Sequence, residues 1–101
     1  MTLNWTNPTT TDYAHTVIRY RTDGKYPVSP VDGFPVADKN AAPGSADSFV
    51  HTGLTNGTTY NYSAFAVDAT GNVSSVAAVQ ATPIDVTPPA AVANLRRTDT
   101  K

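Results

Sequence analysis

Apolar and polar residues alternate strictly along the segment 59–68. One face of this segment then holds Tyr60, Tyr62, Ala64 and Ala66. A period of two residues is typical of a β-strand with one buried face, because successive side chains of a strand point to opposite sides. Leu54 ends the preceding apolar run, and Asn56-Gly57 supplies the positive φ that a tight turn needs. The pattern therefore predicts a strand, a corner and a second strand.

Five further segments have the composition of short strands and are separated by turn residues. The predicted strands are 3–6, 13–22, 34–37, 48–54, 59–68 and 76–82. The chain is rich in threonine, contains 8 prolines and has no glutamate. This composition disfavours helices, since threonine suits a pleated surface and proline suits turns. Short strands at this spacing predict an all-β sandwich.

Length and charge exclude several classes of protein. A chain of 101 residues forms one domain, and its formal net charge of -1 provides no long-range attraction for a phosphate backbone. We therefore expect no nucleic-acid partner. No apolar run approaches the roughly 20 residues of a membrane span. The absence of cysteine excludes thiol chemistry and cysteine metal sites.

The residues around the corner resemble the fibronectin type III family. The matching residues are Leu54, Gly57, Thr58, Tyr60, Tyr62, Ala64 and Ala66. The segment 3–6 resembles strand B of that family with its core tryptophan, and 71–74 resembles its F–G turn. The resemblance covers residues 1–82 and implies an immunoglobulin-like β-sandwich of the fibronectin type III type, in which the Tyr60 hydroxyl turns back onto the corner. It also implies a core that includes Trp5, Ile18, Leu54, Tyr60 and Tyr62.

The C-terminal part resembles the beginning of a further repeat. Residues 88–97 are similar to strand A of the family, with Val92 and Leu95 as inward residues, and they follow a proline-rich linker. No counterpart of strand A precedes Leu3. The domain organisation expected is therefore a sandwich of strands B to G over residues 1–82, followed by the linker and the strand A of the next repeat over 83–101.

Two alternatives remain for the segment 88–97. In a seven-stranded sandwich strand A begins and strand G ends at opposite poles, about 30 Å apart. The linker 83–89 spans at most about 20–25 Å, which strains a return to the same domain. Head-to-tail strand exchange with the open strand B edge of a second molecule is one prediction, and a disordered tail is the alternative.

Catalytic chemistry has few candidate residues. His15 and His51 are the two histidines, and no Gly-x-Ser-x-Gly elbow accompanies them. All 8 carboxylates are aspartates that fall mostly in predicted loops, where turn formation is their usual role. We predict partly exposed histidines of structural character and no enzymatic activity.

Calcium is the one cofactor with candidate ligands. Asp68 and Asn72 belong to the predicted turn after the fifth strand, and Asp85 belongs to the linker near the same pole. Oxygen ligands of this kind suit Ca²⁺. The spacing differs from that of a dedicated calcium loop, and ordinary turn formation by the same residues is the alternative.

Strand parity predicts one mixed face. Val17 and Arg19 of the second strand and Phe65 and Val67 of the fifth point outward by parity. Exposed together, they form an interaction face. The alternative is that Phe65 is covered by Tyr26 or Phe34 from the long region between the strands.

The resemblance implies a non-catalytic structural module of a larger secreted or cell-surface protein of bacterial type. Such a module is repeated in tandem, including in modular carbohydrate-active enzymes, and its partners are the neighbouring domains. The alternative function is a carbohydrate- or protein-binding adhesion module that uses the mixed face and adjacent loops. A hydrolase is the third hypothesis, and its activity would depend on His15 or His51.

Overall fold

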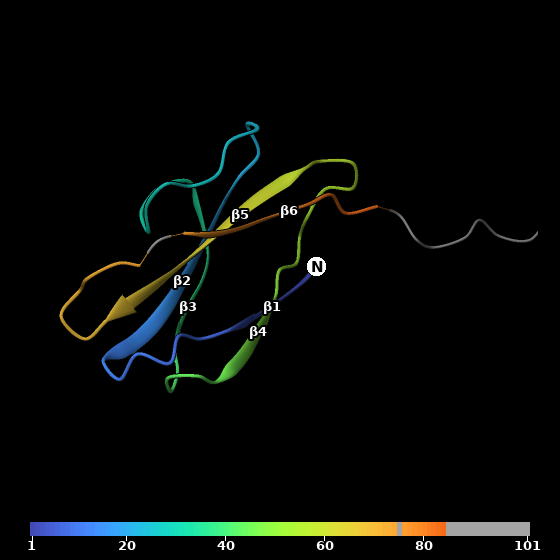
Figure 1. Cartoon of the computed structure of the whole chain (residues 1–101). Helices are drawn as coiled ribbons and strands as arrows, with labels where there is room; N and C mark the ends of the chain where they lie inside the picture. The colour runs from blue at the N-terminus through green and yellow to red at the C-terminus, as the bar shows by residue number, and fades with distance from the viewer. Residues whose placement is uncertain (75, 85–101) are drawn as a thin grey trace, which may run out of the picture.

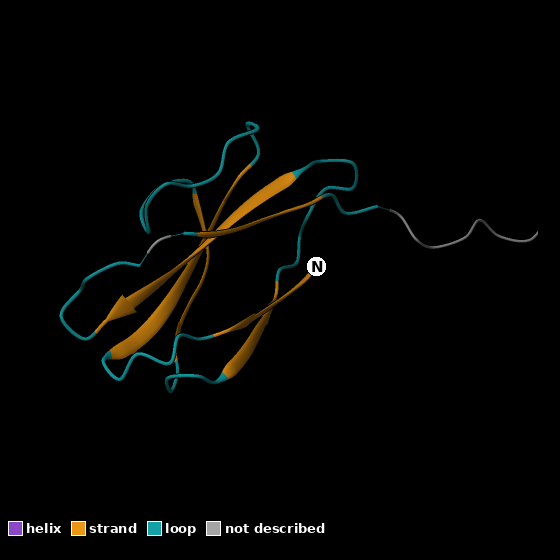
Figure 2. Ribbon diagram, viewed as in Figure 1, coloured by secondary structure: helices purple, strands orange, loops and turns teal. Residues whose placement is uncertain are grey.

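The computed structural model describes residues 1–74 and 76–84, and these residues form strands joined by turns and loops (Figure 1). The strands in this part of the chain are β1 (Thr2–Thr6), β2 (Tyr13–Arg21), β3 (Phe34–Asn40), β4 (Ala46–Val50), β5 (Tyr60–Asp68) and β6 (Ala77–Ala81). The same residues contain no helix (Figure 2). The segment proposed for strand exchange, with Val92 and Leu95, lies outside the described residues.

The strands form two antiparallel sheets. One holds β1 and β4, and the other has the order β3-β2-β5-β6. Figure 1 shows the β1–β4 pair to one side of the larger sheet. The predicted all-β fold of antiparallel sheets is confirmed, and its arrangement is that of a β-sandwich.

Two strands differ from their predicted bounds by more than one residue. β3 continues to Asn40, beyond the predicted segment 34–37. The segment 48–54 was expected to form the fourth strand, whereas β4 covers Ala46–Val50. Pairing with β1 determines this register, since Thr6 lies opposite Ala46 and Thr2 opposite Val50. Beyond that point Gly53 has a φ of +73°, which a regular strand excludes. The residues before Leu54 therefore belong to the corner.

The core lies between the two sheets. Its fully buried residues are Ile18, Tyr60 and Tyr62. The partly buried residues packed against them are Leu3, Trp5, Tyr20, Val36, Ala37, Leu54, Ala64 and Ala81. The five residues that the resemblance implied for the core are all among these. Aromatic rings dominate the packing, with the Tyr60 and Tyr62 centroids 6.4 Å apart.

Tyr60 closes the corner between β4 and β5. Its hydroxyl accepts a hydrogen bond from the backbone N–H of Thr55 at 2.9 Å, while its ring is 6% exposed in the core. Gly57 has a φ of +85° in this turn, and its N–H donates to the carbonyl of Pro83 at 2.8 Å. The corner therefore also anchors the chain just after β6.

Candidate functional site

The predicted interaction face is not exposed. Phe65 is 2% exposed and Val67 is 8% exposed, while Val17 and Arg19 are half-buried. The prediction of an exposed mixed face on β2 and β5 is therefore wrong. The alternative of a covered Phe65 agrees with its burial.

The reason is that the loop 22–33 folds back over the outer face of β5. The hydroxyl of Ser63 donates to the carbonyl of Pro27 at 2.8 Å, and Pro27 is itself buried. The Arg19 guanidinium donates to the carbonyl of Asp32 at 3.0 Å from the neighbouring strand. Of the two aromatic rings expected as a cover, Phe34 stacks on Tyr20 and is 58% exposed.

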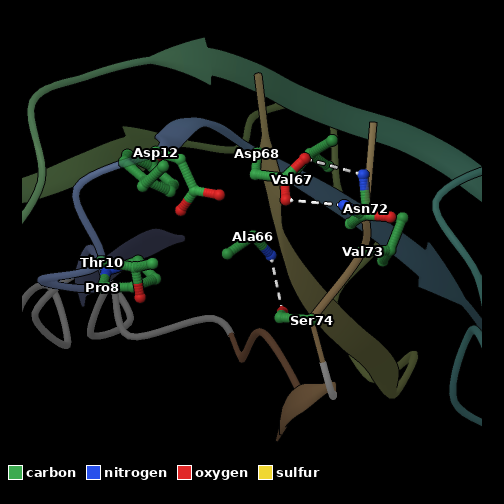
Figure 3. A pocket seen from close by; sticks show the side chains of 10 residues that line it. Pro8, Thr10, Asp12, Ala66, Val67, Asp68, Asn72, Val73 and Ser74 are labelled. Atoms are coloured by element: carbon green, nitrogen blue, oxygen red, sulfur yellow. Dashed lines mark hydrogen bonds between the residues drawn. The ribbon is translucent and has the colours of Figure 1, made fainter. Parts of the chain in front are cut away.

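A pocket of about 280 Å³ lies beside the turn that follows β5 (Figure 3). Figure 3 shows Asp12 and the segment 66–74 on opposite sides of it. The residues that line it are Pro8, Thr10, Asp12, Tyr13, Ala66, Val67, Asp68, Asn72, Val73 and Ser74. Two of the candidate calcium ligands thus share one pocket. The third, Asp85, lies outside the described residues.

The Asp68 carboxylate organises the turn. One of its oxygens accepts bonds from the N–H groups of Thr70 at 3.0 Å and Asn72 at 2.9 Å and from the Thr70 hydroxyl at 2.9 Å. The other accepts from the Asn72 side-chain amide at 3.0 Å. Asn72 thus presents its N–H to Asp68, whereas a calcium ligand presents oxygen. The described residues contain no cluster of three or more histidine or acidic side chains.

These bonds make Asp68 a source of pH dependence. They lower the pKa of Asp68 from its ordinary 3.8 to about 2, with the Asn72 side chain as the largest cause. A depressed pKa in the folded state stabilises the fold above about pH 4, and this contribution is lost as the pH falls toward 2. Asp68→Ala is expected to lower the midpoint of thermal unfolding at neutral pH and to flatten the acid-side loss of stability. Melting curves from pH 7 to pH 2 measure both effects.

Asp12→Ala is the matched control, because Asp12 faces the same pocket and contacts the turn through its backbone carbonyl, which accepts from Ala69 at 3.0 Å. The unfolding midpoint of this variant is expected to fall with decreasing pH in the same way as that of the parent protein. Some acid dependence remains in Asp68→Ala, since Arg21 lowers the pKa of Asp23 and Lys39 lowers that of Asp47. If the unfolding midpoints of Asp68→Ala and the parent protein fell identically with decreasing pH, Asp68 would not be a source of the pH dependence.

The two histidines hold the fold at separate places. His15 Nδ1 lies 2.5 Å from Asp38 Oδ1 and links β2 to β3. His51 Nδ1 lies 2.8 Å from the Tyr62 hydroxyl, and its ring packs 5.2 Å from that of Tyr20. Burial lowers the pKa of His51 and raises that of Tyr62 to about 12. Each histidine is thus engaged with a structural partner.

A buried polar network surrounds Asn7. It was not predicted from the sequence, in which Asn7-Pro8 indicated only the end of the first strand. Asn7 is 2% exposed. Its side-chain oxygen accepts bonds from Trp5 Nε1 at 2.9 Å, the Tyr13 hydroxyl at 2.8 Å and the Thr16 hydroxyl at 2.9 Å. Its amide donates to Ser45 at 3.0 Å. Because these partners come from three separate segments, β1, β2 and the turn before β4, no local sequence signal marks the network.

A groove of about 160 Å³ runs between β1 and β6. Its floor is the core itself, through Ile18 and Tyr62. The residues that line it are Leu3, Asn4, Trp5, Ile18, Tyr62, Ala64, Ala77, Ala78 and Val79. None of these side chains is charged. An open edge of the strand 3–6 was predicted from the sequence, whereas the groove was not.

The part of the chain that the structure describes has no helix with the length and hydropathy needed to cross a membrane. Comparisons of the chain with protein-family models, with curated proteins and with solved structures find no match.

Proposed function

We propose that this chain is a fibronectin type III-like, non-catalytic structural module of a larger secreted or cell-surface protein, where it links and orients neighbouring domains. The order of the strands in the sheets is the observation that carries the proposal. β1 and β4 pair as strands B and E of such a sandwich, and β2, β5 and β6 are neighbours as its strands C, F and G. The hydrogen bond from the Thr55 N–H to the Tyr60 hydroxyl at the start of β5 has the geometry of a tyrosine corner, which supports the proposal.

The use of the reactive side chains supports a structural role. His15 joins two strands, His51 bonds to a core tyrosine and Asp68 organises a turn. Arg21 bonds to Asp23 and Asp32 and holds the loop 22–33. Histidine and aspartate side chains, which can serve acid–base chemistry, here make hydrogen bonds that stabilise the fold.

The exit of the chain supports a role as a spacer. The carbonyl of Pro83 accepts a hydrogen bond from Gly57, so the segment that follows leaves from an anchored point. Residues 83–89 include Pro83, Pro88 and Pro89. Proline-rich linkers act as semi-rigid spacers because the ring restricts φ. Two modules joined in this way are expected to hold a preferred orientation.

A tandem of two full chains tests the proposal. The chain has no cysteine, so Thr52→Cys in each copy introduces two exposed sites for spin labels. Electron–electron distance measurements are expected to give one narrow distribution. The control tandem replaces residues 83–89 with a glycine–serine stretch of equal length, which is expected to broaden the distribution. Equally broad distributions would overturn the spacer role.

A polysaccharide titration distinguishes this function from the adhesion alternative. The Trp5 ring packs against the core and its N–H bonds to Asn7, so its emission is expected to ignore added polysaccharide. A saturable change in that emission would favour a binding module instead.

A further inference from the structure

The inner face of β6 has no covering strand within the described residues. Val79 lies opposite Tyr62 in the sheet register, and paired residues of neighbouring strands face the same side. Tyr62 is 1% exposed, whereas Val79 is 53% exposed. Among the described residues the larger sheet has four strands and the smaller one has two, so the smaller sheet does not extend over the inner face of β6. One more strand beside β1 would cover Val79.

The open edge of β1 carries the backbone groups that such a strand needs. The N–H of Asn7 donates to Ser45, and that of His51 donates to the carbonyl of Met1. In an antiparallel pair, hydrogen-bonded and non-hydrogen-bonded positions alternate, so the odd-numbered residues of β1 bond to β4. The N–H and C=O groups of Thr2, Asn4 and Thr6 therefore point away from β4 toward the groove side.

The two sides of the sandwich differ in chemistry. On the side of β3 and β4, Lys39 of β3 bonds to Asp47 at 2.7 Å and to the carbonyl of Ser48 at 2.9 Å. This lysine occupies the outer edge of β4, and a charged residue at an edge opposes the addition of a strand. The groove side has no charged residue in β1 or β6. An edge of this kind accepts a further strand.

We infer that the groove between β1 and β6 binds residues 88–97 of a second copy of this chain as an antiparallel strand beside β1. This inference deepens the proposed function and rests on it for reading 88–97 as a strand. Val92 and Leu95 supply the apolar side chains that enter the groove. Residues three apart face opposite sides of a regular strand, so both enter only if the donated strand contains a β-bulge.

Polarity selects a second copy over the chain's own tail. His51 bonds to Met1 and Gly57 bonds to Pro83, so β1 begins and β6 ends at the same pole. A strand antiparallel to β1 must begin at the other pole. The ladder of β1 from Met1 to Asn7 spans about 20 Å, and residues 83–89 reach at most about 25 Å, so a return to the far pole uses most of their length and leaves little for the sideways step and the reversal. A tail that doubled back at once would run parallel to β1, in a fold whose sheets are antiparallel.

The predicted contact is heterologous, since each copy offers one tail and one groove. Head-to-tail contacts that do not close form chains of increasing length. The mean mass of the full chain in light scattering is therefore expected to rise with concentration and to exceed that of a dimer at high concentration.

Two acceptor variants test the groove. Asn4→Pro removes one outward N–H of β1 and leaves its bonds to β4 in place, and Asn4→Ala is the matched control that keeps the N–H. Val79→Lys places a charge at a half-exposed position of β6, so it tests the groove even if Asn4→Pro fails to fold. Asn4→Pro and Val79→Lys are expected to stay monomeric, whereas Asn4→Ala is expected to associate like the parent protein.

Complementation tests the direction of exchange. The donor variant V92D/L95D in the full chain is expected to be monomeric by itself. Mixed with Asn4→Pro or with Val79→Lys, it is expected to form dimers and nothing larger, because one partner supplies only a tail and the other only a groove. Crosslinking with isotope-labelled chains would show one copy of each variant in every dimer.

A parent protein that is monomeric at every concentration would overturn the exchange, although a narrow distance distribution in the tandem would still support the spacer role. Association that persists unchanged in both acceptor variants would also overturn it, since the contact would then lie elsewhere. Mixtures that remain monomeric would exclude the head-to-tail arrangement.

Discussion

Replacing Tyr62 by alanine is expected to lower the free energy of unfolding by about 3–5 kcal/mol, the range for truncation of a large buried aromatic side chain. Tyr62 is 1% exposed and packs with Ile18 and Tyr60 at the centre of the core. The substitution leaves a cavity between the sheets and removes the hydroxyl partner of His51. Small domains are stable by only about 5–15 kcal/mol, so the loss is a large part of the total. Urea denaturation followed by circular dichroism measures it.

Two variants separate the causes of that loss. Tyr62→Phe keeps the ring and removes the hydroxyl, and it is expected to cost about 1 kcal/mol because only one hydrogen bond is lost. Tyr26→Ala truncates a tyrosine that is 39% exposed and is expected to cost less than Tyr62→Ala. Equal losses in Tyr62→Ala and Tyr26→Ala would show that the core does not depend on this ring.

Asn7→Ala is expected to destabilise the protein by at least about 3 kcal/mol. The substitution removes the acceptor shared by Trp5, Tyr13 and Thr16, and each buried donor left without a partner costs about 1–3 kcal/mol. The hydroxyls of Tyr13 and Thr16 lie 2.6 Å apart and satisfy one another in part, which keeps the expected loss near the lower bound. Urea denaturation with Trp5 emission as the signal measures the effect at the network itself.

Asn40→Ala is the control for a general effect of losing an asparagine. Asn40 ends β3 and is exposed, so its replacement is expected to change stability by less than about 0.5 kcal/mol. A loss below about 1 kcal/mol for Asn7→Ala would mean that solvent replaces the amide, and the network would then not be a determinant of the fold.

The strands and the corner were predictable because their causes are local. Alternation in 59–68 places Tyr60 and Tyr62 inward, and Asn56-Gly57 supplies the turn that brings Tyr60 back to Thr55. A period of two residues is a direct consequence of strand geometry, so it survives in any tertiary context.

The burial of Phe65 was not predictable from the alternation of inward and outward side chains along β5. Parity places Phe65 on the outer face of its sheet, but it cannot show that the loop 22–33 returns to that face through Pro27. This contact joins residues 36 positions apart in the chain. The Asn7 network could not be predicted for the same reason, since its partner Ser45 lies 38 positions away in the chain. Parity likewise places Val79 inward without showing whether a strand covers it.

The start of β1 and the end of β6 lie at one pole, and this arrangement determines how the described strands carry mechanical load. Met1 and Pro83 are both bonded to the connection between β4 and β5. Tension between these points peels β1 from β4 and β6 from β5 one hydrogen bond at a time, and sequential rupture requires little force. In the proposed head-to-tail array, tension would enter through the docked strand at the far pole and would load many hydrogen bonds in shear together. A filled groove would therefore convert a domain that unzips under tension into one that resists extension.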